Sequence, residues 1–198
     1  TAGNTGSSGT TANFTIDTTA PTAAITYTGG SSPYLAGETV KITATFNGPV
    51  LDSPVPTIAI AGSGIANVTS TNMARTSTTV YTYSYSVPTG DGTGTVTVGT
   101  GTDAAGNIVT ATPTSGATFT VDNTAPSLTQ VTAVVTPSNN TTPSYVFTTG
   151  EAGTITSSLS FSSTTSATTG SNQTITFSTL SEGTYSPTVT VTDAAGNF

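Results

Sequence analysis

Short runs of alternating apolar and polar residues recur along most of the chain. The clearest run spans residues 38–46, where Val40, Ile42, Ala44 and Phe46 share one face. Because successive side chains of a β-strand point to opposite faces, this run predicts a strand with one buried side. Segments rich in Gly and Pro separate the runs, as expected of turns between strands. Helix caps and a 3.6-residue stripe are missing, so the pattern predicts an all-β fold.

The first full set of runs predicts seven strands within about 100 residues, the size of an immunoglobulin-type sandwich. These strands are expected around Ala24 and Tyr27, over 38–46, at Ile58 and Ile60, at Ile65 and Val68, over 80–87, at Val96 and Val98, and over 117–121. Tyr81, Tyr83 and Tyr85 share a face with Val87, which favours core packing over a sugar-stacking platform. Lys41 lies on the face opposite Ile42, so we expect it to be exposed, which argues against a buried isopeptide crosslink.

A second, shorter set of runs begins after residue 124. Strands are expected at Leu128, Val131 and Val134, over 145–147, over 155–159, at Ile175 and Phe177, and at Val189 and Val191. Tyr185 stands where sandwiches often carry a corner tyrosine, whose hydroxyl bonds nearby backbone. A seventh strand is not found in this set.

Two motifs repeat and set the expected boundaries. Thr-Asp-Ala-Ala-Gly-Asn occurs at residues 102–107 and 192–197, and a truncated copy opens the chain. Asp-x-Thr-Ala-Pro occurs at residues 17–21 and 122–126. Such repetition indicates tandem domains. We therefore expect the last strand and linker of a preceding repeat over 1–20, a first domain over 21–123, and a second over 124–198 whose last strand is missing.

Composition and charge exclude several classes of function. The chain holds two basic residues against nine acidic ones, for a net charge of −7. Such a charge argues against nucleic-acid binding and against anionic membrane surfaces, which attract clustered Lys and Arg. No apolar run approaches the roughly 20 residues of a membrane helix. His and Cys are both absent, which removes the commonest general base and the thiol nucleophile, so we expect no enzyme activity.

Carboxylates at one pole of each sandwich suggest a cation site. The loop after strand two, the loop after strand six and the start of strand one share a pole, which gathers Asp122, Glu151 and Asp193 in the second domain. Asn123 and Asn197 would add amide oxygens, and the equivalent first-domain group is Asp17, Asn47 and Asp103. Ca²⁺ accepts six to eight such oxygens, so Ca²⁺ is the expected cofactor. The alternative is that Asp103 and Asp193 cap tight turns and that Asp17 and Asp122 are solvated linker charges.

Phe14 and Ile16 belong to the apolar set of residues 1–16. These residues of one copy could complete the second domain of another copy by strand addition at an open edge. The alternative explanation is that the sequence is a piece of a longer array.

The motifs resemble the bacterial Ig-like repeats of large cell-surface adhesins. The resemblance rests on residues 17–21 and 121–126, on the two Asp-Ala-Ala-Gly-Asn loops, and on residues 37–40 and 46–50. It implies an extracellular or cell-surface array, often stiffened by calcium, in which most repeats are spacers whose partners are neighbouring repeats or copies of the chain. Asn47 departs from the Glu often found there, which weakens a metal site in the first domain. A glycan- or host-surface-binding module and an accessory domain of a secreted enzyme remain alternatives.

Overall fold

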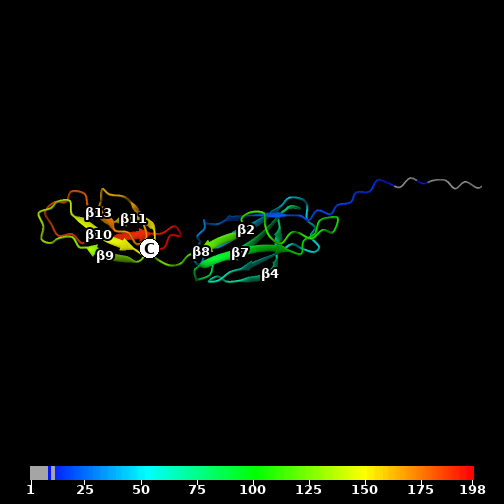
Figure 1. The fold of residues 1–198 in the computed structure, drawn as a ribbon, viewed down its shortest axis with the longest axis horizontal. Helices are drawn as coiled ribbons and strands as arrows, with labels where there is room; N and C mark the ends of the chain where they lie inside the picture. The colour runs from blue at the N-terminus through cyan, green and yellow to red at the C-terminus, as the bar shows by residue number, and fades with distance from the viewer. Residues whose placement is uncertain (1–8, 10–11) are drawn as a thin grey trace, which may run out of the picture.

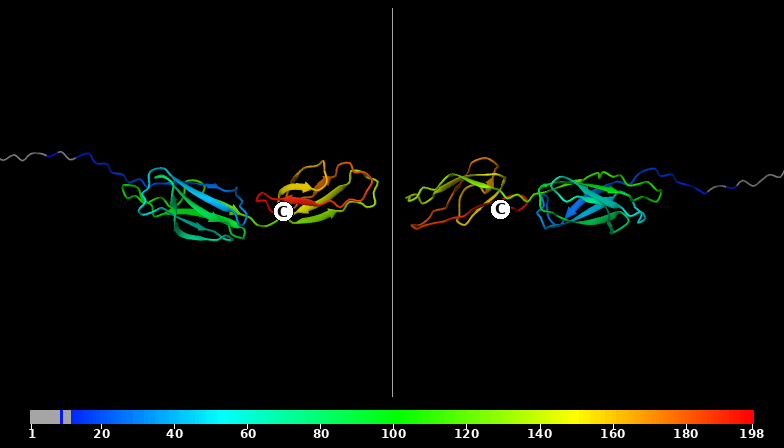
Figure 2. Two further views of the ribbon diagram at one scale, coloured as in Figure 1. Left: turned by 180° about the vertical axis from the view of Figure 1, so that it is seen from behind. Right: turned by 90° about the horizontal axis from the view of Figure 1, so that it is seen from below.

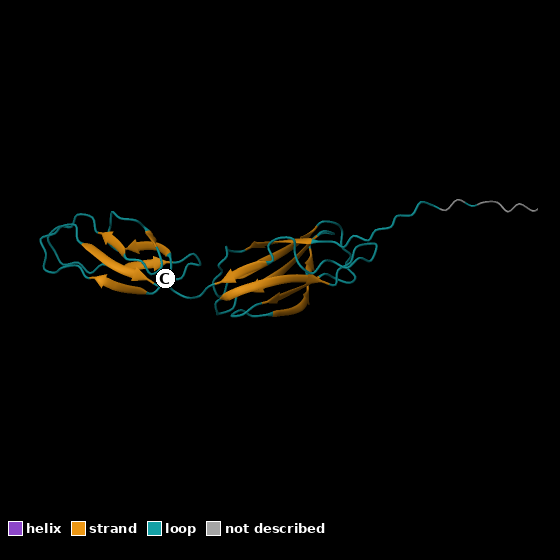
Figure 3. Ribbon diagram, in the orientation of Figure 1, coloured by secondary structure: helices purple, strands orange, loops and turns teal. Residues whose placement is uncertain are grey.

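A computed structural model describes residue 9 and residues 12–198, and these residues contain strands and loops but no helix (Figure 3). Every paired strand is antiparallel, which confirms the predicted all-β sandwich class. The strands form two sandwiches that follow one another end to end (Figures 1 and 2). A short linker between β8 and β9 joins them.

The first sandwich contains two four-stranded sheets. One has the order β1-β2-β6-β5 and the other β4-β3-β7-β8. The strands are β1 (Ala23–Thr28), β2 (Thr39–Phe46), β3 (Thr57–Ala61), β4 (Val68–Asn72), β5 (Ala74–Arg75), β6 (Val80–Ser86), β7 (Gly92–Gly99) and β8 (Thr118–Val121).

The second sandwich contains two three-stranded sheets, β13-β10-β9 and β12-β11-β14. Its strands are β9 (Leu128–Thr132), β10 (Ser144–Thr149), β11 (Gly153–Ser157), β12 (Ser166–Ala167), β13 (Gln173–Thr176) and β14 (Val189–Thr192). Among the described residues, no strand pairs with the edge of β14 that faces away from β11. In the first sandwich, β8 covers the matching edge of β7.

The alternating residues of the sequence form the two cores. Nineteen buried apolar residues make up the first core, whereas six make up the second. Phe119 of β8 lies in the first core, with its ring centroid 5.6 Å from that of Tyr27, 6.2 Å from Tyr34 and 5.4 Å from Tyr85. A Cβ at Gly94 of β7 would lie 2.5 Å from the Phe119 ring, so the glycine makes room for that ring.

Several strand predictions are confirmed and several are wrong. β2 matches its predicted bounds almost to the residue. The sequence pattern does not predict β5 and β12, because a strand of two residues is too short to show alternation of apolar and polar residues. Val134 lies beyond β9, and Leu159 lies beyond β11. Residues 12–16 form no strand, since no described neighbour pairs with them, while residues 1–8, 10 and 11 lie outside the described part of the chain.

The aromatic predictions are confirmed. Tyr81 and Tyr85 are buried, and Tyr83 packs against the same core, so this row is core and not a sugar platform. The Tyr185 hydroxyl donates to the carbonyl of Ser181, 3.1 Å away, as a corner tyrosine does. Lys41 is exposed, as expected from its strand position.

Truncating Phe119 should unfold the first sandwich at lower denaturant. Phe119→Ala removes a ring buried among three tyrosines, a change that typically costs about 3–5 kcal/mol of unfolding free energy. Urea unfolding followed by tyrosine near-ultraviolet circular dichroism measures the loss. Thr118→Ala, at an exposed position of the same strand, is the matched control and should change the free energy by less than about 0.5 kcal/mol. Equal effects of the two variants would contradict this role of Phe119.

Candidate functional site

The linker at residues 122–126 is hydrogen-bonded to both sandwiches. The Asp122 N–H donates to the Tyr34 carbonyl of the first sandwich at 3.0 Å. The Asp122 carbonyl accepts from Nδ2 of Asn197, in the loop after β14, at 3.0 Å. Each side of one peptide residue is therefore held by a different sandwich.

Asn123 extends the contacts with the first sandwich. Its Nδ2 donates to the Gly90 carbonyl and its Oδ1 accepts from the Ala36 N–H, both at 2.6 Å. The carboxylate of Asp91 accepts from the Asn123 N–H and from the Thr124 hydroxyl. The Asn123 amide is thus bonded to the first sandwich, and its expected part in a cation site with Asp122, Glu151 and Asp193 stays a prediction.

The Asp-Ala-Ala-Gly-Asn loop after β14 is a capped turn. Asp193 Oδ1 accepts from the backbone N–H of Gly196 at 2.7 Å and of Asn197 at 2.9 Å, and its Oδ2 accepts from Asn197 Nδ2 at 2.9 Å. Gly196 has φ of 103°, a left-handed conformation that glycine adopts without strain. Asp193 therefore caps this turn, as the turn-capping alternative predicted. Because a carboxylate offers about four acceptor sites, its oxygens can also accept a further bond or bind a cation.

The earlier copy of this loop holds the earlier linker in the same way. Asp103 Oδ1 accepts from the N–H groups of Ala105 and Asn107, and Asn107 Nδ2 donates to Asp103 Oδ2. Asn107 Nδ2 also donates to the carbonyl of Asp17 at 3.1 Å, as Asn197 does to that of Asp122. Each loop therefore clamps the peptide that leads into its own sandwich.

The two capping aspartates are held in their charged form. The hydrogen bond from the Asn107 side chain is the main cause that lowers the pKa of Asp103. Desolvation opposes it, and bonds from backbone N–H groups lower the pKa further. Desolvation alone would raise the pKa of Asp193, but the bonds from Asn197 and the neighbouring backbone N–H groups outweigh it and leave the pKa lowered. Both loops are thus expected to loosen only in acid, when these carboxylates gain a proton.

Three carboxylates meet beside the second clamp. Asp122, Glu151 (in the loop between β10 and β11) and Asp193 each place one oxygen within 4.8 Å of the others. Glu151 Oε2 is inaccessible to solvent and accepts no hydrogen bond from the described residues. Desolvation, and then the charges of Asp122, Asp193 and Asp91, raise the pKa of Glu151. An unpartnered carboxylate oxygen facing two more carboxylates suits a hard cation with oxygen ligands, such as Ca²⁺.

The first pole lacks the third carboxylate. The Asn47 N–H donates to the Thr22 carbonyl, and the Gly150 N–H donates to the Ser127 carbonyl, so Asn47 matches Gly150. The residue that matches Glu151 is then Gly48, and the predicted equivalence of Asn47 with Glu151 is wrong by one position. Asn47 Oδ1 instead accepts from the Thr22 N–H at 2.9 Å.

Family comparison agrees with this architecture. Residues 135–198 match the family model described as a bacterial Ig-like domain. The second sandwich is a bacterial Ig-like domain. The first sandwich shares its strand plan and its clamp loop with this Ig-like domain. No curated protein matches the chain. The described residues form no helix that is long and apolar enough to cross a membrane.

Glu151→Gln should stabilise the metal-free protein at neutral pH. Since the folded state raises the pKa of Glu151, the unfolded chain releases this proton first as pH rises, and stability falls through that window. The variant should gain less than about 1 kcal/mol at about pH 7, because solvent screens part of the repulsion. At about pH 3, where both states hold the proton, the gain should vanish. Thermal unfolding in chelator at the two pH values measures it, and a gain that does not depend on pH would contradict charge repulsion as its cause.

Proposed function

We propose that the chain is a non-catalytic structural segment of an extracellular surface protein, in which Ig-like domains act as spacers. The observation that carries this proposal is the linker clamped from both sides, through Tyr34 on one side and Asn197 on the other. A joint held in this way resists bending, because tilting one sandwich must break bonds to the other. Stiff joints repeated along a chain produce a stalk, whereas flexible linkers produce a coil.

The repetition of the clamp supports a serial arrangement. Asn107 holds Asp17 with the geometry with which Asn197 holds Asp122. The same bond thus precedes each sandwich, so a domain attached through residues 12–16 would meet the same joint. A spacer built from identical joints gains length with each repeat.

Calcium at the second joint is the finer part of the proposal. Asp122 belongs to the linker, while Glu151 and Asp193 belong to the second sandwich, so a cation bound by all three would add a further tie across the joint. Support comes from the unpartnered Glu151 Oε2 and from the raised pKa of Glu151, both of which a bound cation would relieve. No comparable group of three acids forms among the described residues at the first pole.

The binding-module alternative has less support. A sugar-binding platform stacks its ligand on exposed aromatic rings, but Tyr34, Tyr81 and Tyr85 are buried. Tyr185 is exposed to 42%, and its hydroxyl is already bonded within its own loop. We therefore prefer the structural role to glycan recognition.

Calcium should raise the thermal midpoint of the second sandwich. At a hundredfold excess over its dissociation constant, a ligand that binds only the folded state stabilises it by about 2.7 kcal/mol. Glu151→Gln should abolish the response, because it removes the unpartnered carboxylate oxygen. Glu182→Gln makes the same chemical change at an exposed residue of the same sandwich and should keep the full response. Thermal unfolding with Ca²⁺ and then with chelator measures all three proteins, and an unchanged wild-type midpoint would remove calcium from the proposal.

Asn197→Ala should loosen the joint, because it removes the bond to the Asp122 carbonyl. Asn107→Ala makes the same cut in the equivalent loop, but that loop holds Asp17 and not the linker between the two sandwiches. Small-angle scattering and interdomain residual dipolar couplings, both in chelator, should therefore report a wider spread of orientations for the first variant only. Equal spread in wild type and Asn197→Ala would contradict the stiff joint, whatever calcium does.

A further inference from the structure

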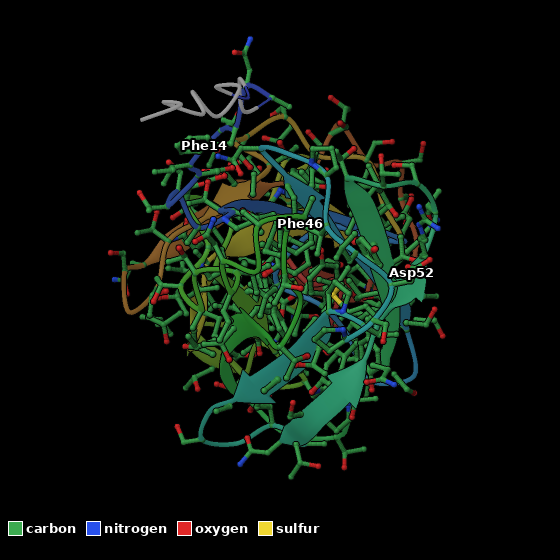
Figure 4. The ribbon with its side chains drawn as sticks, turned by 90° about the vertical axis from the view of Figure 1, so that its right-hand side faces the viewer. Phe14, Phe46 and Asp52 are labelled. Carbon is green, nitrogen blue, oxygen red and sulfur yellow. The ribbon has the colours of Figure 1, made fainter. Side chains whose placement is uncertain are left out.

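The chain crosses the first sandwich from one pole to the other. It enters beside residues 17–21 and leaves through the linker, and the second sandwich follows on that side (Figures 1 and 2). Figure 4 looks onto the entry pole, with Phe14 of the entering segment outside the sandwich that encloses Phe46. A pull along the chain would therefore draw residue 21 and residue 122 in opposite directions, along the long axis of the sandwich.

The first and last segments of this sandwich lie side by side from the entry pole to the exit pole. Residues 21–34 run beside residues 110–122 in the same direction, and isolated parallel bridges join Ala24 to Ser115 and Tyr34 to Val121. We call this contact the seam. Its two sides are the segments through which tension would enter and leave the sandwich.

Backbone bonds hold the part of the seam nearer the entry pole. Three of them, between 2.7 and 3.0 Å long, run from Thr110 to Pro21, from Thr114 to Ala23, and from Ile25 to Ser115. The Tyr27 hydroxyl donates a further bond of 2.6 Å to the Gly116 carbonyl. A Cβ at Gly116 would collide with the Ile25 carbonyl oxygen, so the close approach of the two segments requires glycine there.

Tyr34 and Ser32 hold the part of the seam nearer the exit pole. The Tyr34 N–H donates to the Thr120 carbonyl at 2.9 Å, and the Tyr34 carbonyl accepts from the Asp122 N–H at 3.0 Å. Ser32 Oγ accepts from the Thr120 N–H at 2.9 Å. The seam thus ends at Asp122, the residue at which the chain leaves the sandwich.

The seam also joins the edges of the two sheets. β1 is the outer strand of one sheet and β8 is the outer strand of the other. Each is paired with its own sheet on one side, β1 with β2 and β8 with β7, and is bonded across the seam on the other side. Neither terminal strand can leave its sheet while the seam is intact.

The direction of pull decides how such a contact fails. When two parallel neighbours are drawn in opposite directions along their length, all the bonds between them are stretched together. When the same pair is pulled apart from one end, the bonds break one after another, and each break needs less force. Tension along this chain acts on the seam in the first way, because residue 21 and residue 122 lie at opposite poles.

We propose that the first sandwich resists tension along the chain, with the seam as the contact that delays its unfolding. The proposal deepens the spacer role and rests on it, because a segment that holds something away from a cell is pulled at both ends. A spacer resists bending at its joints, whereas a tether must also stay folded under a pull. Forced unfolding is governed by the unfolding rate and not by equilibrium stability, so a contact that must break first sets that resistance.

Two directions of pull on the same protein test the proposal. The chain has no native cysteine, so handles can be attached at introduced cysteines of the 198-residue chain. Thr19→Cys with Ala125→Cys loads the seam from pole to pole, whereas Thr19→Cys with Thr110→Cys pulls it open from the entry pole. In single-molecule pulling at one loading rate, the first pair should unfold at the higher force. Equal forces for the two pairs, or a higher force for the second, would overturn the proposal.

The pulling experiment separates this proposal from the spacer role. Attachment at residues 19 and 125 leaves the second sandwich outside the load, and calcium is not needed. A seam that gives no added resistance would overturn the tension-resisting role and leave the spacer proposal standing. A flexible joint in the wild-type protein would contradict the stiff spacer and leave the result for the seam unchanged.

Gly116→Ala tests the close approach of the two segments. Gly116 and Gly37 both have positive φ, 67° and 86°, but an added Cβ meets the Ile25 carbonyl at Gly116 and nothing within 4 Å at Gly37. Gly37→Ala is therefore the matched control for backbone strain. In the pole-to-pole direction Gly116→Ala should unfold at a lower force than Gly37→Ala, and equal forces would contradict a role of this contact.

A milder pair of variants removes only side-chain bonds. Tyr27→Phe with Ser32→Ala cuts one bonding group from each part of the seam, while Tyr83→Phe with Ser84→Ala makes the same chemical changes on β6, away from the seam. One net hydrogen bond corresponds to roughly a two- to tenfold change in rate. Under constant pole-to-pole force the first double variant should unfold at least about twofold faster than the second. Equal rates would count against the seam as the contact that delays unfolding.

Discussion

The hydrogen bond from Asn197 to the Asp122 carbonyl is the contact on which the relation of the two sandwiches depends. It exists because Asp193 caps its own turn and, in doing so, fixes the Asn197 side chain in place. One side chain thus serves the turn and the joint together. Loss of the Asn197 side chain would therefore weaken both the turn and the joint. The Asp122 carbonyl would have to bond solvent, and the loop would keep its shape through backbone hydrogen bonds alone.

Alternation and repetition in the sequence were sufficient to predict most of the fold. The buried faces of β2 and β6 could be read because each carries apolar residues at every second position. The meeting of Asp122, Glu151 and Asp193 could also be predicted, since a sandwich places those loops at one pole. The outward turn of Asn123 could not, because it depends on Ala36 and Gly90, whose loops have no periodicity. The mismatch at Asn47 is a one-residue register difference, which only the backbone bonds reveal.

The two sandwiches differ most at the position of β8, which no described strand occupies in the second sandwich. In the first, β8 brings Phe119 and Val121 into a core of nineteen residues, and in the second the described residues supply six. Burial of apolar surface stabilises by about 25 cal/mol per Å², so β8, which buries Phe119 and Val121, contributes substantially to the stability of the first sandwich.

The joint sets the direction in which the two sandwiches follow one another. β8 ends at Val121, and the carbonyl of the next residue, Asp122, is held by Asn197 in the loop after the last strand of the second sandwich. Reversing β8 would place Asp122 at the far end of the first sandwich, away from Asn197. Strand polarity, set by which side chains are buried, thus fixes the direction in which the second sandwich follows the first.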